Sequence, residues 1–176
     1  MATRISYKNQ IKQAQENDEK LIKSLLQSIH DEINIIYEIY QDSIGKIIDN
    51  LPKGAPLDGY YPLESEYFTV YNGNSCLIGR ITDNDLRKQI IKTYTLAKGM
   101  VDALRQNNNF IEKREIAYKL SIDTKDKEHK EYFNNHTTQL IKYAKIIKDS
   151  HKSFKDSVSE LFEKLRKNGV SNERNN

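Results

Sequence analysis

The chain has 176 residues, of which 37% are hydrophobic and 30% charged, and its formal net charge is +3. This length fits one ordinary domain with a real core, and the 28 basic and 25 acidic residues are mixed, so no nucleic-acid footprint is indicated. The single cysteine, Cys76, excludes an intramolecular disulfide and a cysteine-built metal site. No apolar run approaches the roughly 20 residues that cross a bilayer, and no signal-peptide core is present, so we expect a cytoplasmic protein.

The first predicted helix runs from about residue 7 to residue 50, and Pro52 ends it. Its apolar residues return every three or four positions, which keeps one side dry, and Gly45 allows a bend near its end. Such a helix is about 60 Å long at 1.5 Å per residue, so it needs a partner of similar length. The apolar stripe comprises Ile11, Ala14, Leu21, Ile22, Leu25, Ile29, Ile33, Ile36, Tyr40, Ile44, Ile47, Ile48 and Leu51.

The next part of the chain is irregular. All three prolines lie within residues 52–62, which predicts a loop rather than a linker between domains. Aromatic and apolar residues then recur at helical spacing, predicting a short helix over residues 63–77 that is closed by Gly79. A strand over residues 66–71 is the alternative, because Tyr, Phe, Thr and Val favour strands, but a lone strand would have nothing to pair with.

Thr82 or Asp83 caps a third predicted helix. Gly99 inside it costs roughly 1 kcal/mol against alanine, which suggests a close helix contact at that point. The run of asparagines at 107–109 either ends this helix or passes into a shorter continuation through Ile122. The buried stripe comprises Leu86, Ile90, Tyr94, Ala97, Val101 and Leu104.

The C-terminal helix is predicted over residues 125–167 and is the partner expected for the first helix. Residues 1–168 then form a single domain. Residues 169–176 lack the helical spacing of apolar residues and are expected to form a frayed tail. The predicted fold is an all-α, elongated three- to four-helix bundle with two long antiparallel helices and shorter helices inserted between them. An exposed stripe on such helices is commonly closed by a second copy, so we expect a homodimer. The C-terminal stripe comprises Phe133, Leu140, Ala144, Ile147, His151, Phe154, Val158, Leu161 and Leu165.

No constellation of residues indicates catalysis, a metal or a cofactor. The histidines that follow His30 lie seven and fifteen residues apart, at 129, 136 and 151, rather than at the i, i+3 or i+4 spacing of a helical metal site. His151 is therefore expected to be a hydrogen-bonded residue between packed helices. Cys76 is expected to be a small core hydrophobe rather than a nucleophile. The sequence predicts no enzyme.

An aromatic cluster is the one candidate for recognition. Its tyrosines could form a partner or ligand surface, because they combine a large contact area with a polar group. The same residues could instead plug one end of the bundle, and we favour that interpretation. The candidate surface comprises Tyr60, Tyr61, Tyr67, Phe68, Tyr71, Asn72 and Asn74.

Two stretches near this cluster, Tyr67-Phe68-Thr69-Val70-Tyr71-Asn72-Gly73-Asn74 and Ile78-Gly79-Arg80-Ile81, are followed by Leu86 and by Tyr94-Thr95-Leu96-Ala97-Lys98-Gly99. This pattern, over about a third of the chain, resembles that of uncharacterised bacterial helical proteins in which an N-terminal membrane helix often precedes the core, and residues 7–13 are similar to the segment just after that helix. No such helix is present here, so the chain is either a soluble member or begins at the membrane boundary. In the second case Arg4, Lys8 and Lys12 are the positive charges expected at the inner face of the membrane. The resemblance implies no activity.

The sequence therefore predicts a non-enzymatic helical scaffold or interaction module, either a soluble protein or the cytosolic part of a membrane-tethered one. Its expected partner is a second copy or another helical protein. The alternative is a small-molecule sensor or ligand-binding bundle that uses residues 60–76, and a cavity beside Tyr71, Cys76 and Tyr94 would favour it. An enzyme would require a cleft that brings His136 or His151 close to a carboxylate.

Overall fold

The computed structural model describes residues 2–63 and 67–170, with side chains from residue 8 onward. The described residues are helices and loops without a strand, so the alternative of a strand within residues 67–71 was wrong. The elements are α1 (Ala2–Tyr40), the π-helical segment η1 (Gln41–Gly45), α2 (Lys46–Asp49), α3 (Thr69–Gly73), α4 (Ser75–Ile78), α5 (Asn84–Thr124) and α6 (Lys127–Lys167).

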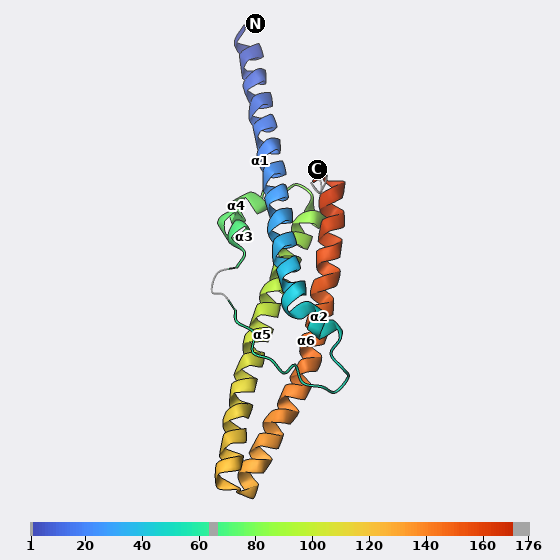
Figure 1. The fold of residues 1–176 in the computed structure, drawn as a ribbon. Helices are drawn as coiled ribbons and strands as arrows, with labels where there is room; N and C mark the ends of the chain where they lie inside the picture. Colours follow the sequence, from blue (N-terminus) through green and yellow to red (C-terminus); the bar gives the residue numbers. More distant parts are fainter. Residues whose placement is uncertain (1, 64–66, 171–176) are drawn as a thin grey trace.

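Helices α5 and α6 form an antiparallel hairpin that spans the length of the body (Figure 1). Each has 41 residues, and the turn between them is only two residues long. Asp83 is the N-cap of α5, as predicted, because its Oδ1 accepts from the amides of Asp85 and Leu86 at 2.9 and 3.0 Å. Asp126 caps α6 in the same way, accepting from the amide of Glu128 at 3.0 Å. The predicted stripe of α6 is confirmed, with all its members buried except Phe133, which is half-buried.

The all-α bundle with long antiparallel helices is confirmed, but the partner of the C-terminal helix was assigned incorrectly. The asparagines at 107–109 do not end the third helix, which runs on to Thr124 and equals α6 in length. Helix α6 therefore pairs along its length with α5. Helix α1 covers only the half of the hairpin near its open end (Figure 1).

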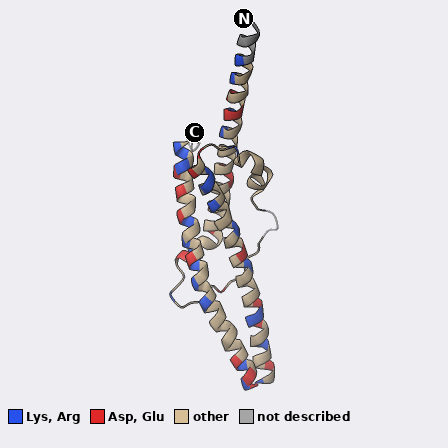
Figure 2. Ribbon diagram, turned by 180° about the vertical axis from the view of Figure 1, so that it is seen from behind, with Lys and Arg blue, Asp and Glu red and all other residues tan. Residues whose placement is uncertain are grey.

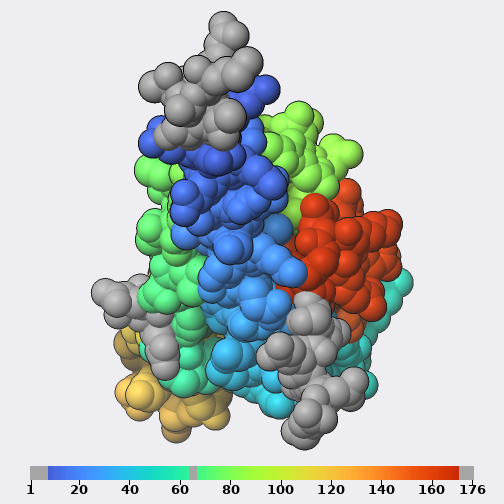
Figure 3. All heavy atoms as spheres, turned by 90° about the horizontal axis from the view of Figure 1, so that it is seen from above, coloured from blue at the N-terminus to red at the C-terminus, as the bar shows by residue number. Residues whose placement is uncertain are grey.

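Helix α1 divides into a packed part and a free part. From Leu25 to Ile33 its dry face is buried against the hairpin, as the stripe predicts. Residues 8–21, which we call the overhang, are all exposed and extend past the body (Figures 1 and 3). Viewed from above in Figure 3, α1 stands between the α3–α4 segment on one side and the ends of α5 and α6 on the other. The prediction that Ile11, Ala14 and Leu21 are buried was wrong within this chain.

The loop predicted over residues 52–62 is present within an irregular segment, residues 51–63, which crosses the hairpin from α6 to α5 and which we call the strap. Side chains of α5 and α6 hydrogen-bond to the backbone of the strap and to the carboxylate of Asp58. These bonds satisfy polar groups that an irregular segment cannot pair within itself. Lys148 Nζ donates to Leu51 O at 2.6 Å, Asn107 Nδ2 to Leu57 O at 3.0 Å, Asn108 Nδ2 to Tyr61 O at 2.7 Å, and Arg114 to both Asp58 oxygens at 2.6 and 2.9 Å.

The short helix predicted over residues 63–77 is two short helices, α3 and α4, divided at Asn74. Residues 64–66 lie outside the described residues. Gly79 follows α4 as its C-cap, as predicted. The frayed tail predicted from 169 onward falls mostly outside the description, but Gly169 has a φ of +79° and Val170 is buried, with its amide bonded to Leu165 O at 3.1 Å. This is a Schellman-type end to α6.

Gly99 is exposed, and a Cβ added there would meet nothing within 4 Å, so the predicted close helix contact was wrong. Replacing Gly99 by alanine should therefore raise the free energy of unfolding by about 1 kcal/mol, because alanine loses less backbone entropy in a helix. Urea unfolding followed by circular dichroism measures this. Gly45→Ala is the matched control: its Cβ would lie 2.4 Å from Oε1 of Gln41, so that side chain must move and the gain should be smaller. A destabilised Gly99→Ala would contradict the prediction.

Candidate functional site

Glu32 of α1 joins three elements around the predicted aromatic cluster. Its Oε1 accepts from the amide of Val70 at 2.7 Å, and its Oε2 accepts from the amide of Tyr71 at 3.2 Å and from the hydroxyl of Tyr94 at 2.7 Å. The first amides of a helix have no partner within it, and α3 has no side-chain cap of its own, so Glu32 serves as that cap from another helix. Burial, followed by this hydrogen bond, raises the pKa of Tyr94, so its hydroxyl stays protonated and donates.

Aromatic rings fill the space around Tyr94. Tyr71 stacks on it with ring centres 4.1 Å apart, and Phe68 meets it edge-on at 5.6 Å. The ammonium of Lys98 lies 5.1 Å above the Tyr71 ring and donates to Asn72 Oδ1 at 3.1 Å. The cavity that would have favoured a ligand beside Tyr71 and Tyr94 is thus occupied by side chains of the chain itself.

The structure divides the predicted candidate surface into two groups. Tyr60 and Tyr61 lie in the strap, where Tyr60 is 62% exposed. The other five residues surround α3, with Phe68 buried and the amides of Asn72 and Asn74 bonded to nearby backbone carbonyls. Whether these residues recognise a partner stays a prediction.

Cys76, predicted to be a small core hydrophobe, is exposed instead. It lies on α4, a single turn of helix in which Ile78 is the buried residue. That correction removes Cys76 from any buried site with Tyr94.

His151 is buried between packed helices and hydrogen-bonded, as predicted. Its Nδ1 lies 2.6 Å from the hydroxyl of Tyr40, and its Nε2 lies 3.0 Å from Oδ1 of Asp49. Lys155 completes the group by donating to both Asp49 oxygens at 3.0 and 2.8 Å. These bonds, first from Lys155 and then from His151, lower the pKa of Asp49, whereas burial raises the pKa of Tyr40. The hydroxyl of Tyr40 on α1 keeps its proton, and the imidazole of His151 on α6 is only 3% exposed. Through the bonds of His151 to Tyr40 and to Asp49 of α2, the three helices are held together.

His136 is the other buried histidine of α6. Its Nδ1 lies 3.2 Å from Oε1 of Gln139, while Nε2 is buried without a hydrogen-bond partner. Within the part of the chain that the structure describes, no group of three or more His, Cys, Asp or Glu side chains could hold a metal ion.

The overhang presents apolar side chains to solvent. Ile11 and Leu21 are 43% and 44% exposed. Ile11 precedes Ile22, which packs against the core, by eleven residues, or about three helical turns, so it faces the same side. The ion pair between Asp18 and Arg80 lies at the base of the overhang.

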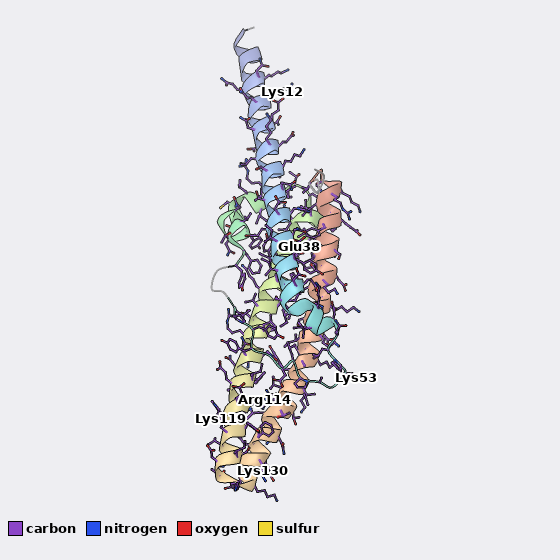
Figure 4. All side chains as sticks on the ribbon, viewed as in Figure 1. Lys12, Glu38, Lys53, Arg114, Lys119 and Lys130 are labelled. Carbon is purple, nitrogen blue, oxygen red and sulfur yellow. The ribbon has the colours of Figure 1, made fainter. Side chains whose placement is uncertain are left out.

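Sequence reasoning missed a group of lysines on α6. Lysines 142, 145, 148, 152 and 155 return every three or four positions, the spacing of one helix face. These lysines form no contiguous block of charge, and their helical periodicity is the signal that reveals them. Three of these lysines, with Lys53 of the strap, line a hollow of about 350 Å³. Figure 4 shows Lys53 on the strap where it passes beside α6.

Comparison with known proteins gives no match: no protein-family model, no curated protein and no solved structure matches this chain. Among the residues described, no helix combines the length and apolar character that a membrane span needs.

Glu32→Gln should lower the free energy of unfolding by about 2–3 kcal/mol. The glutamine amide has one acceptor oxygen in place of the two of the carboxylate, and it lacks the negative charge that strengthens these hydrogen bonds. Urea unfolding measures the change, and near-ultraviolet circular dichroism should show Tyr94 and Tyr71 losing their fixed geometry. The control is Glu112→Gln on the exposed face of α5, which should stay within about 0.5 kcal/mol of the wild type. Equal effects in the two variants would show that Glu32 does not join the elements.

Acid should destabilise the protein through Asp49. Because its pKa is lowered in the folded state, the unfolded chain binds the proton more readily, and stability present above the ordinary carboxyl pKa of about 4 is lost as the pH falls below it. Asp58 and Asp83 also have lowered pKa values and add to this loss. Asp49→Asn should therefore flatten the plot of unfolding free energy against pH below about 4. Asp123→Asn, at an exposed position near the end of α5, is the control of equal charge. If both variants keep the wild-type slope, the Asp49 network contributes no stability.

Proposed function

We propose that this chain is a non-enzymatic helical interaction module that joins a second copy of itself through the overhang of α1. The observation that supports this most strongly is the exposure of every residue from 8 to 21 in an otherwise well-packed helix. Isolated helices of about this length are marginal in water, because their stability in proteins comes from packing of a dry face. Apart from the ion pair of Asp18 with Arg80, the overhang continues the packing face of α1 past the body, so it is suited to a partner from outside.

Charge favours a second copy in antiparallel orientation. Along the overhang, Lys8 and Lys12 come first, and Glu16 and Glu19 follow; Figure 2 shows the basic turns nearer the N-terminus. Antiparallel pairing of two overhangs places the basic half of each beside the acidic half of the other, whereas parallel pairing opposes like charges. Ile11 and Leu21 then supply the apolar contact between the helices.

The expected dimer is weak. Stable specific interfaces bury about 1,200–2,000 Å² in total, and one face of a helix about 20 Å long supplies less than that. We therefore expect a dimer that dissociates on dilution rather than an obligate one. Exposed ion pairs contribute little to affinity but do decide between orientations and partners.

The test is light scattering behind size exclusion at several protein concentrations. The wild type should move from monomer to dimer as the concentration rises. The variants Lys8→Glu/Lys12→Glu and Glu16→Lys/Glu19→Lys should each stay monomeric, because both halves of the overhang then carry net charge of one sign, negative in the first variant and positive in the second. An equimolar mixture of the two variants should recover the dimer.

The control is Lys113→Glu/Lys119→Glu, which makes the same change of charge at exposed positions on α5 and should leave dimerisation intact. Figure 4 shows Lys119 near the closed end of the hairpin, far from the overhang. A monomer at every concentration of the wild type would overturn the proposal. A dimer unaffected by the reversals would place the interface elsewhere.

A further inference from the structure

The hollow between the strap and α6 is lined by apolar residues and lysines. Pro52, Gly54 and Ala55 form one wall, and Ile141 and Ala144 lie on the other. Ala144 is 2% exposed, so the hollow reaches down to the buried face of α6. The side chains of these wall residues make apolar contacts with an occupant and form no hydrogen bonds.

Four lysines complete the lining, and no carboxylate belongs to it: Lys53, Lys142, Lys145 and Lys148. Lys148 donates to the carbonyl of Leu51 at 2.6 Å, so its ammonium is already bound. The other three are exposed and make no ion pair with the described residues. Lysine side chains commonly lay their methylene groups along apolar surface while the ammonium stays in water. The hollow therefore combines an apolar floor with a positive rim.

We infer that this hollow binds a small anionic amphiphile, an aliphatic chain that ends in a carboxylate. The chain would lie along Ile141, Pro52 and Ala55, whose apolar surface is still open to solvent, so burying it is favourable. The carboxylate would lie at the rim, within reach of Lys53, Lys142 and Lys145. A volume of about 350 Å³ lies at the lower end of the range of small-molecule sites, so a chain of moderate length fits better than a long one. A bare inorganic anion would leave the apolar floor exposed to water and gain only exposed ion pairs.

Decanoate is the probe, added to the full-length chain labelled with ¹⁵N at constant ionic strength. Saturable shifts of the amide signals of Ala55, Ile141 and Ala144 are expected. Decyltrimethylammonium, which has the same chain and the opposite charge, should produce none of them, and neither should sulfate. Shifts spread over the overhang and both ends of the hairpin, or no saturation, would overturn the inference.

Lys142→Gln/Lys145→Gln should weaken decanoate binding by about three- to tenfold, the sum of two exposed ion pairs. Lys142→Arg/Lys145→Arg should restore it, because the charge returns. The control, Lys113→Gln/Lys119→Gln, removes the same charge at exposed positions on α5 outside the hollow and should bind as the wild type does. Equal weakening in the control would mean that net charge alone attracts the probe. Binding to phosphatidylglycerol vesicles without binding of free decanoate would assign the lysines to a membrane surface and overturn the small-ligand site.

Discussion

The structure depends on one constraint of length: two helices can bury their dry faces along their whole length only against a partner of equal length. Helices α5 and α6 have 41 residues each and satisfy this requirement with one another. Helix α1 has 39 residues, almost the same length, but it is shifted along the hairpin, so it packs only near the open end and its first turns pass beyond the body (Figure 1). The strap must return from α2 to the start of α3 across the uncovered hairpin. The overhang, the strap and the lysine-rimmed hollow all follow from that shift.

Polar side chains fix how the helices align, because apolar packing alone tolerates sliding. Gln89 and Thr93 of α5 are buried opposite Ser157 of α6, with Thr93 Oγ1 lying 2.8 Å from Ser157 Oγ and Gln89 Nε2 donating to Ser157 O at 2.9 Å. A shift of one helix by a turn would leave these groups buried without partners, which costs more than the bonds themselves contribute. Glu32, and about two turns further on Tyr40 through His151, fix α1 in the same way.

The sequence predicted what depends on local periodicity and short-range capping. The stripes of α5 and α6, the cap at Asp83 and the burial of His151 all follow from residues within a few turns of each other. Contacts between segments that are distant in the chain could not be predicted from the sequence. Asn107 and Asn108 resemble a helix end until the strap that binds their amides is known. Glu32 looks like any exposed glutamate of a charged helix, because its partners come 38 to 62 residues later.

The same limit explains the error on the overhang. A stripe shows which face of a helix is dry but not which turns find a partner, so Ile11 and Ile29 look alike in sequence although one is exposed and the other buried. The lysines of α6 were overlooked for a different reason. Their charges are separated by apolar residues and become a group only when the helix brings every third or fourth residue to one side.

The overhang and the hollow should act independently, although α1, η1, α2 and the strap connect them in sequence. A ligand shifts a conformational equilibrium only if it binds two arrangements of the protein with different affinity. The strap is held from both sides of the hairpin, by Lys148 on α6 and by Asn107, Asn108 and Arg114 on α5. Between it and the overhang, the buried bonds of His151 to Tyr40 and Asp49 hold the end of α1 and α2 against α6. An occupant of the hollow therefore meets walls that are already fixed, and a second copy bound at the far end of α1 has no loose element through which to move them.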